Sequence, residues 1–482
     1  MSNSNDNEPP LRNVSNFPIK TRVYWGISSF GTALVSGIYG SLLSIFYTDY
    51  LGLSEDAYII NIVSLIYLVW NAFNDPLFGF LSDKTKSDKG RRIPFMRYTA
   101  PFLGLTFALI WWADPSFNDW EIFAWMLTTM LLYDTAYTII GIVYSALLPE
   151  ITEHEQGRNQ LQVFANFFYL LGTIIGFILP DMFRHEAGDL LPLRMAMIGA
   201  GVIAAGCVMF TTYKFKERPE FAQGDDPLGL IDSIKYTFKS KSFLILTAGN
   251  FMSILTQSLV IGSMFYLADY VTQSSTILLL ICIFLPLILG IWFSPKMIEK
   301  WGVVRSDQIL LVIGGIGLLL LTILPGNFVY LGVFLGGVGL IGPLQFTNLM
   351  YAQVADEDEL ETGVRREAAF FGVNALLTKP AQSFALMIPA ALLSWASFIP
   401  RSANEGEIFL PQPEPVYIAI KIFIGLIPGI ALLLEALIFK WYPLKGDYLK
   451  KIQKEILVLH EEKHNRYYGK KEPIAEKSTQ DR

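Results

Sequence analysis

The sequence predicts an all-α membrane protein with twelve transmembrane helices in two six-helix bundles and with both termini in the cytoplasm. Three observations support this fold class: apolar segments of spanning length recur, basic residues concentrate in alternate loops, and the two halves resemble each other weakly. Hydrophobic residues make up 52% of the 482 positions, a share too high for an ordinary soluble protein.

Apolar segments long enough to cross a bilayer, which takes roughly 20 residues, occur twelve times. Six precede a polar stretch in the middle of the chain, and six follow it. The expected spans are 23–47, 57–81, 93–113, 122–148, 161–179 and 193–213 in the first half, and 243–270, 275–298, 308–324, 328–354, 368–398 and 416–442 in the second.

These spans set the expected domain organisation. After the last span, apolar residues recur among charges at helical spacing, which predicts an amphipathic helix on the cytoplasmic side. The expected parts are a cytoplasmic tail at 1–21, a first bundle at 22–213, a central cytoplasmic loop at 214–241, a second bundle at 242–442, and a cytoplasmic tail with the amphipathic helix at 443–482.

The basic residues predict the orientation, because short loops rich in Lys and Arg stay in the cytoplasm. The loops at 51–56, 114–119, 272–274 and 325–327 contain no Lys or Arg, whereas the loop at 82–92 is strongly basic. We therefore expect a multi-pass protein of the cell membrane with both termini inside.

The two halves share a charged pattern where the fourth span of each meets the fifth. A Tyr-Ser-Ala-Leu-Leu-Pro-Glu segment ending at Glu150 leads to Arg158, and a Tyr-Ala-Gln-Val-Ala-Asp-Glu segment ending at Glu357 leads to Arg365. Parallel repeats of this kind are typical of two bundles around a central cavity. Chance matching of charged loops is the alternative.

Several function classes are disfavoured by composition and motifs. The net charge of −6 and the scattered basic residues argue against nucleic-acid binding. All four histidines fall in loops or the tail, and the HExxH, GxSxG and P-loop motifs are absent from the sequence, so no enzyme is expected. We expect a monomer in the lipid bilayer, without a cofactor, that binds a small-molecule substrate.

A carboxylate inside the second apolar segment is the first candidate functional group. Inserting an acid such as Asp75 near the centre of a membrane helix costs roughly 2.5–3.5 kcal/mol, so it usually faces a cavity or a partner. Asn71 lies one turn earlier, and Pro76 leaves the carbonyl of Ala72 without its helical hydrogen bond. These oxygens suit a hard cation or a proton. The alternative is a kinked helix with Asp75 in a static salt bridge.

A set of motifs is specific when taken together. The motifs are Phe-Tyr-Thr-Asp-Tyr-Leu-Gly-Leu-Ser at 46–54, Asn-Asp-Pro-x-x-Gly at 74–79 with Gly-Arg-Arg-x-Pro-Phe at 90–95, Leu-Pro-Glu-Ile-Thr at 148–152, Lys379, and Tyr-x-Leu-x-Gly-Asp-x-Leu-x-Lys-Ile-Gln at 442–453.

With these motifs, almost the whole chain resembles the glycoside–pentoside–hexuronide:cation symporters of the major facilitator superfamily, the family typified by melibiose permease. Members of that family carry a substrate with Na⁺, Li⁺ or a proton, and a related branch carries lysophospholipids. The resemblance implies a symporter that works by alternating access. A sugar, a glycoside or a related organic solute is the expected substrate, and a lipid symporter or scramblase on the same scaffold is the alternative.

The resemblance also implies a cation site between the second and fourth helices. The two cation carboxylates of the family fall on Asn71 and Asp75, and its asparagine and threonine ligands fall on Asn74 and Thr138. Because Asn71 is neutral, the site favours a proton slightly over Na⁺ as the coupling ion. No other metal is expected.

The sugar site of the family is not reproduced in this chain. Its acids on the first and fourth helices fall on Ala33 and Gly141, and its arginine falls on Asn166. Lys379 is kept, and the resemblance brings the second and eleventh helices together, so Asp75 and Lys379 can form an ion pair across the two halves. A cation or proton would compete with Lys379 for the carboxylate. A permanent structural pair is the alternative.

Further polar residues inside the spans are candidates for the substrate path. Asp134 precedes Gly141 by two helical turns on the same face, which suggests that a cavity-facing acid has moved along the helix. Asn250 and Gln257 give the seventh span a polar stripe, and Asn166 completes the candidate set. The alternative for these residues is hydrogen bonding between neighbouring helices.

Charged residues in the basic loops can form latches that break and reform as the halves rock. The alternative is that the basic residues only enforce topology. The candidate latches pair Asp83 with Arg91 and Arg92, Glu150 with Arg158, and Asp356 with Arg365 and Arg366.

Overall fold

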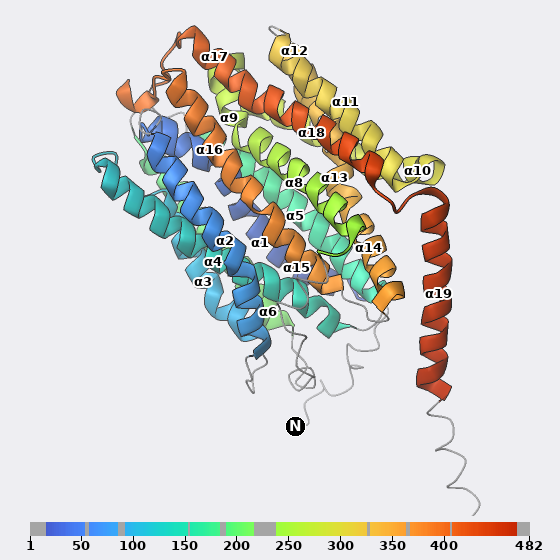
Figure 1. The fold of residues 1–482 in the computed structure, drawn as a ribbon. Helices are drawn as coiled ribbons and strands as arrows, with labels where there is room; N and C mark the ends of the chain where they lie inside the picture. Colours follow the sequence, from blue (N-terminus) through green and yellow to red (C-terminus); the bar gives the residue numbers. More distant parts are fainter. Residues whose placement is uncertain are drawn as a thin grey trace, which may run out of the picture.

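The chain folds almost entirely into long, roughly aligned helices (Figure 1). The computed structural model describes residues 16–53, 57–84, 92–152, 155–183, 189–215, 238–324, 328–362, 367–404 and 407–469. The prediction of an all-α protein is therefore confirmed.

The first half of the chain forms six long helices. They are α1 (Ile19–Ile45), which the π-helical η2 (Phe46–Tyr50) extends, followed by α2 (Ala57–Lys84), α3 (Ile93–Ile110), α4 (Asp119–Ile151), α5 (Glu155–Phe183) and α6 (Leu191–Lys214).

The second half is more interrupted, because several of its long segments are broken. Its elements are α8 (Lys241–Gly262) with α9 (Met264–Tyr266) and the π-helical η4 (Leu267–Thr272), α10 (Thr276–Trp301), α11 (Val303–Ile323), the broken series α12 (Phe328–Gly339), α13 (Ile341–Gln345) and α14 (Thr347–Thr362), then α15 (Glu367–Thr378), α16 (Pro380–Trp395), η5 (Arg401–Ala403), α17 (Glu414–Lys421), η6 (Ile422–Leu426), α18 (Ile427–Ile438), η7 (Phe439–Trp441) and α19 (Gly446–Gly469).

Eleven helical segments in the described part of the chain are long and apolar enough to cross a membrane. They correspond to eleven of the twelve expected spans. The remaining one corresponds to α2, a helix of 28 residues that carries Asn71, Asn74 and Asp75. The twelfth span, the orientation of the termini and the domain boundaries stay predictions.

Local sequence signals fix where α4 and α16 begin. Asn118 caps α4: its side-chain oxygen accepts hydrogen bonds from the amides of Trp120 (3.0 Å) and Glu121 (3.1 Å), and the Glu121 carboxylate accepts one from the amide of Asn118 (2.8 Å). Pro380 is the first residue of α16, and Lys379 lies in the break between α15 and α16. The break holds Lys379 in the middle of the eleventh expected span.

Helices within the first half approach one another closely. A Cβ on Gly172 of α5 would lie 2.5 Å from the carbonyl oxygen of Phe30, and one on Gly176 would lie 2.6 Å from that of Leu34. In the same way, a Cβ on Gly104 of α3 would lie 2.6 Å from the carbonyl oxygen of Gly201 of α6. Small residues at such crossings allow tight packing between membrane helices.

The two halves meet along α2 and α16, which run side by side (Figure 1). Further contacts lie toward the end of the molecule where α1 and α8 finish. There a Cβ on Gly262 would lie 3.2 Å from the carbonyl oxygen of Gly40, and the Thr276 hydroxyl donates to Asp181 at 2.8 Å. We call this end of the molecule the Arg401 end.

The expected amphipathic helix after the last span exists as α19. Its apolar residues Ile452 and Ile456 are buried, and α19 packs against α14. The apolar face of this part of α19 therefore lies on the protein. The far part of α19 extends away from the other helices (Figure 1).

Candidate functional site

The predicted ion pair between the two halves is confirmed. Lys379 Nζ lies 2.5 Å from Asp75 Oδ1, and the two side chains are 18% and 22% exposed, respectively. Asp75 comes from α2, and Lys379 comes from the break before α16. A single pair with this much exposure joins the halves without being sealed from ions or water.

Two buried asparagines flank this ion pair on α2. Neither side-chain atom of Asn71 has a hydrogen-bond partner among the described residues, and the same holds for Oδ1 of Asn74. Both residues are 1% exposed. A buried polar atom without a partner costs about 1–3 kcal/mol, so these unpartnered amide oxygens point to a ligand that brings positive charge.

Asp134 lies on α4 beside these asparagines. Its Oδ2 accepts a hydrogen bond from Asn74 Nδ2 at 2.6 Å, and its Oδ1 accepts one from the Tyr67 hydroxyl at 3.0 Å. The residue is 7% exposed, and the charges of Lys379 and Asp75 act on it. The structure thus brings Asp134, expected on the substrate path, next to the residues expected to bind the cation.

Thr138 completes this group because it follows Asp134 by one turn of α4 and faces the same way. Its side chain is buried. Nearby, Trp70 Nε1 donates to the hydroxyl of Thr135 at 3.3 Å, which ties α2 to α4. Carboxylate, amide and hydroxyl oxygens from two joined helices make a donor set that suits a hard cation.

The other substrate candidates are more scattered. Asn250 of α8 donates to Oδ1 of Asn374 at 3.1 Å, a contact within the second half that fits the alternative of bonding between helices. Gln257 is half-buried on the same helix. Asn166 is exposed on α5 and accepts from Gln162 Nε2 at 2.9 Å. None of the described contacts joins these three residues into one site.

Most of the predicted latches fall outside what the structure describes. Arg91, Arg365 and Arg366, and the side chains of Asp83 and Glu150, lie outside the described residues. Arg92 and Asp356 lie within them, and Arg158 donates from Nε to the carbonyl of Thr152 at 2.8 Å. The latches stay predictions.

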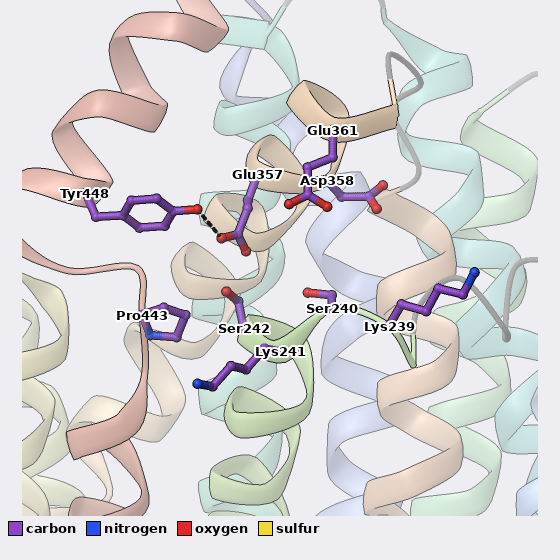
Figure 2. A pocket seen from close by; sticks show the side chains of 9 residues that line it. All are labelled: Lys239, Ser240, Lys241, Ser242, Glu357, Asp358, Glu361, Pro443 and Tyr448. Atoms are coloured by element: carbon purple, nitrogen blue, oxygen red, sulfur yellow. Dashed lines mark hydrogen bonds between the residues drawn. The ribbon is translucent and has the colours of Figure 1, made fainter.

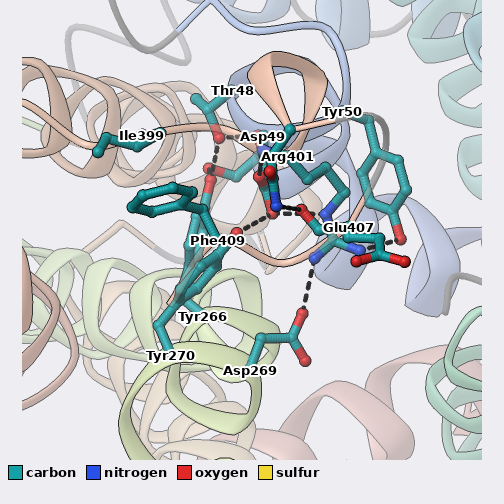
Figure 3. Close-up of polar contacts among 12 residues, drawn as sticks. Thr48, Asp49, Tyr50, Tyr266, Asp269, Tyr270, Ile399, Arg401, Glu407 and Phe409 are labelled. Atoms are coloured by element: carbon teal, nitrogen blue, oxygen red, sulfur yellow. Dashed lines mark hydrogen bonds and ion pairs between the residues drawn. The ribbon is translucent and has the colours of Figure 1, made fainter. Parts of the chain in front are cut away.

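The strongest link between the halves involves residues that sequence reasoning missed. Arg401 donates from its amide to Asp49 Oδ1 (2.6 Å) and from Nε to Asp49 Oδ2 (2.8 Å), and its NH2 group donates to Asp269 Oδ2 (2.9 Å) (Figure 3). Tyr270 also donates to Asp49, at 2.7 Å, and the Arg401 guanidinium lies 4.1 Å from the ring centre of Tyr50. We call Arg401, Asp49 and Asp269 the arginine lock.

The arginine lock is buried, and its guanidinium stays charged. Arg401 is 2% exposed, and both aspartates are buried with it. Burial lowers the pKa of Arg401, but Asp49, Tyr50, Tyr270 and Asp269 together more than offset this effect, so its pKa lies well above the ordinary value. The guanidinium therefore remains a cation at the Arg401 end.

The two aspartates of the lock occupy similar positions in the two halves. Asp49 lies in the π-helical segment that ends α1, and Asp269 lies in the π-helical segment that follows α8. Each is preceded by Phe-Tyr a few residues earlier and followed by Tyr: Tyr50 in one case and Tyr270 in the other. This repeat, together with an arginine in an otherwise base-poor loop, was the available sequence signal.

A cavity of about 400 Å³ lies elsewhere, at the start of α8 (Figure 2). Glu357 lines it and accepts a hydrogen bond from the Tyr448 hydroxyl at 3.0 Å, which raises the pKa of Tyr448. Its lining comes from the second half alone, and it contains none of the candidate cation or substrate residues. The cavity is lined by Lys239, Ser240, Lys241, Ser242, Glu357, Asp358, Glu361, Pro443 and Tyr448.

Comparison with known proteins agrees with the helical architecture. Residues 24–446 match the family described as MFS/sugar transport protein. This chain belongs to that family. It is a multi-pass integral membrane transporter of the major facilitator superfamily, and it is not an enzyme.

Similar sequences carry differing descriptions. The chain is 24% identical to the sodium-dependent lysophosphatidylcholine symporter 1 of Gallus gallus over 88% of this chain and 87% of the relative. It is also 24% identical to the Escherichia coli protein named "Putative glycoside/cation symporter YagG", over 96% and 99%. The family membership expected from the motifs is thus confirmed, while sugar specificity is not.

Solved structures share the fold at low sequence identity. A point mutant of the nucleoside transporter NupG aligns with a TM-score of 0.62 and 13% identity, over 87% of this chain and 99% of that one. A bacterial homologue of the human lysosomal transporter Spinster aligns with a TM-score of 0.60 and 11% identity, over 89% and 100%. These likenesses support the major facilitator fold.

Proposed function

We propose that this transporter is a cation-coupled symporter that carries a sugar, a glycoside or a related organic solute by alternating access. The observation that carries the proposal is the Asp75–Lys379 ion pair, which joins the two halves beside unpartnered Asn71. A cation that binds Asp75 releases Lys379, so ion binding changes how the halves are held together.

The coupling ion we propose first is Na⁺. Asn71 removes one carboxylate from the pattern of the family, but Asp134 supplies another, because it is hydrogen-bonded to Asn74 across the α2–α4 contact. Together with Thr138 these residues offer only oxygen ligands. The sodium-dependent description of the Gallus gallus relative fits this choice. A proton on Asp75 is the alternative coupling ion.

In this mechanism the arginine lock at one end of the molecule alternates with the charged latches at the other end. The arginine lock holds one end of the molecule closed in the described state. Substrate and cation would then reach Asp75 and Lys379 from the other end, which we propose is cytoplasmic. Opening at the Arg401 end requires Arg401 to leave Asp49 of the first half. The charged latches on the cytoplasmic side would form as the lock breaks.

Lysophosphatidylcholine transport is the second candidate function. The similarity to the Gallus gallus symporter favours it, and Ala33 and Gly141 offer no acid for binding a sugar. Lys379 can meet either a sugar hydroxyl or a phosphate, so this residue fits both substrate classes.

Purified protein in proteoliposomes tests the proposal. Uptake of methyl β-D-galactoside and of lysophosphatidylcholine is measured under an inward Na⁺ gradient, under an inward proton gradient, and with neither. We expect one probe to accumulate above its equilibrium level with Na⁺. Asp75→Asn should abolish accumulation, because the cation loses its carboxylate, while Asp447→Asn, at a fully exposed side chain, should not.

Three outcomes separate the alternatives. Accumulation that follows the proton gradient replaces Na⁺ with a proton as the coupling ion. Accumulation of the lysophospholipid alone replaces the sugar with the lipid. Equilibration of the lipid without accumulation under any gradient contradicts symport and indicates a scramblase.

A further inference from the structure

A second pair of buried acids lies inside the second half of the chain, far along the sequence from Asp75. Asp307 lies near the start of α11, and Glu435 lies near the end of α18. Each is 1% exposed. The two helices pack together, and Gln308 Nε2 donates to the carbonyl of Ala436 at 2.9 Å, so the two acids lie at the same level of the helix pair.

The contacts of Glu435 indicate a protonated carboxyl group. Ser253 Oγ of α8 lies 2.6 Å from Glu435 Oε1 and 2.5 Å from Oε2. A serine hydroxyl has one hydrogen, so an ionised carboxylate can accept only one of these two hydrogen bonds in full. A protonated carboxyl completes both: one oxygen donates to Ser253, and the other accepts from it.

The contacts of Asp307 support the same conclusion independently. Its Oδ1 has no hydrogen-bond partner among the described residues, and no described Lys or Arg forms an ion pair with Asp307 or Glu435. An ionised carboxylate that is buried without a cation, and that has an oxygen without a hydrogen-bond donor, is strongly disfavoured. A proton neutralises it and needs no further ligand.

The space around Asp307 is too small for a hydrated ion. A Cβ on Gly342 would lie 1.8 Å from Asp307 Oδ1, so the carboxyl rests directly on the backbone of α13. Glu435 interacts electrostatically with two titratable groups, Asp307 of α11 and Tyr351 of α14. The contacts that α8 and α13 make with the two acids come from Ser253 and Gly342, which carry no charge.

The backbone that touches Asp307 belongs to a broken helix. The segment at 328–362 is interrupted before and after the short α13, and Pro343 leaves the carbonyl of Gly339 without its helical donor. Broken membrane helices are frequent at the ion sites of transporters. A shift of α13 would change the solvation of Asp307 directly.

We propose that Asp307, Glu435 and Ser253 form a proton-binding site in the second half of the chain, separate from the cation site at Asp75. The site takes at least one proton from water and holds it on Glu435 against Ser253. This assignment goes beyond the proposed symport and does not depend on the substrate.

Infrared difference spectroscopy of the full-length protein in lipid nanodiscs tests the site. We expect the wild-type protein to show the carbonyl band of a protonated carboxyl group at neutral pH. Glu435→Gln should remove this band, and Ser253→Ala should shift its frequency. Asp447→Asn, at a fully exposed carboxylate, and Asp134→Asn, in the other half, should leave it unchanged.

The opposite results overturn the proposal. If neither Glu435→Gln nor Asp307→Asn alters any protonated-carboxyl band of the wild-type protein, the pair holds no proton. A thermal-stability measurement in NaCl and in choline chloride provides a second test. If Na⁺ raises the melting temperature, and Asp307→Asn with Glu435→Gln removes this increase while Asp75→Asn keeps it, the site binds Na⁺ instead.

Discussion

Arg401 and Lys379 both reach from the second half of the chain to an aspartate of the first, but they do so in different surroundings. Arg401 is 2% exposed and binds Asp49 through two atoms and Asp269 through a third. Lys379 is 18% exposed and makes one contact with Asp75. A planar guanidinium with several fixed donors holds a geometry, whereas an ammonium on a flexible stem can change partner.

This difference indicates separate roles for the two links. The arginine lock closes one end of the molecule, and opening that end means that Arg401 has to leave the buried Asp49 of the first half. The Asp75–Lys379 pair lies where a cation can reach it and beside amide oxygens that have no other partner among the described residues. One link therefore resists opening, and the other responds to ligands.

The largest expected effect comes from breaking the lock. Arg401→Gln removes the cation that the buried Asp49 and Asp269 share, and we expect the free energy of unfolding to fall by about 3–5 kcal/mol. Chemical denaturation in detergent measures this loss. Arg194→Gln is the matched control, because the hydrogen bonds that Arg194 donates within the described part of the chain go to the backbone of Trp111 and Ala113 in its own half. An equal loss in both variants would contradict a special role for Arg401.

A smaller loss of stability is expected from a change at Tyr270, at the same end of the molecule. Tyr270→Phe removes the hydroxyl that donates to Asp49 and leaves the ring in place. We expect a loss of about 1.5–3 kcal/mol, the range for a hydrogen bond to a charged group. Combining this change with Arg401→Gln should give less than the sum of the two losses, and strict additivity would show that the two residues do not act on one carboxylate.

The Asp75–Lys379 ion pair should contribute little to stability and much to transport. Because the pair is partly exposed, Lys379→Gln should lower the free energy of unfolding by only about 1 kcal/mol. Cation-driven uptake should nevertheless be lost, because the ion no longer displaces a competitor from Asp75. A fall in stability as large as that of Arg401→Gln would mean that the pair is a static support.

The smallest expected effect is at the exposed contact of α19. Tyr448 is 44% exposed and donates to Glu357. Tyr448→Phe should change the free energy of unfolding by about 0.5 kcal/mol or less, as is usual for surface positions. The same denaturation experiment checks it. A loss above that of Lys379→Gln would contradict the order proposed for these contacts.

Residues on long apolar helices were the most predictable part of the molecule. Asp75 and Lys379 stand out as charges inside apolar segments, and the family resemblance brought their helices together, so their pairing could be predicted and is confirmed. The contacts of Asp134 were harder to predict, because its hydrogen bonds to Asn74 and Tyr67 depend on the rotation of α2 and α4 relative to each other.

The lock could not be predicted in the same way. Arg401 follows a helix in a long loop, and its two aspartates come from the ends of other helices, so only the fold brings them together. The same is true of Glu435, whose proximity to Asp307 depends on the packing of α18 on α11. Residues that come together from distant segments form no motif with a recognisable spacing in the sequence.

The glycine contacts between α1 and α5 have a mechanical consequence. With Gly172 and Gly176 in contact with the backbone of α1, these two helices cannot slide past each other without a steric clash. The pair should behave as a stiff lever. Any displacement that starts at Asp49, at the tip of α1, is then transmitted along the length of α5 to its far end.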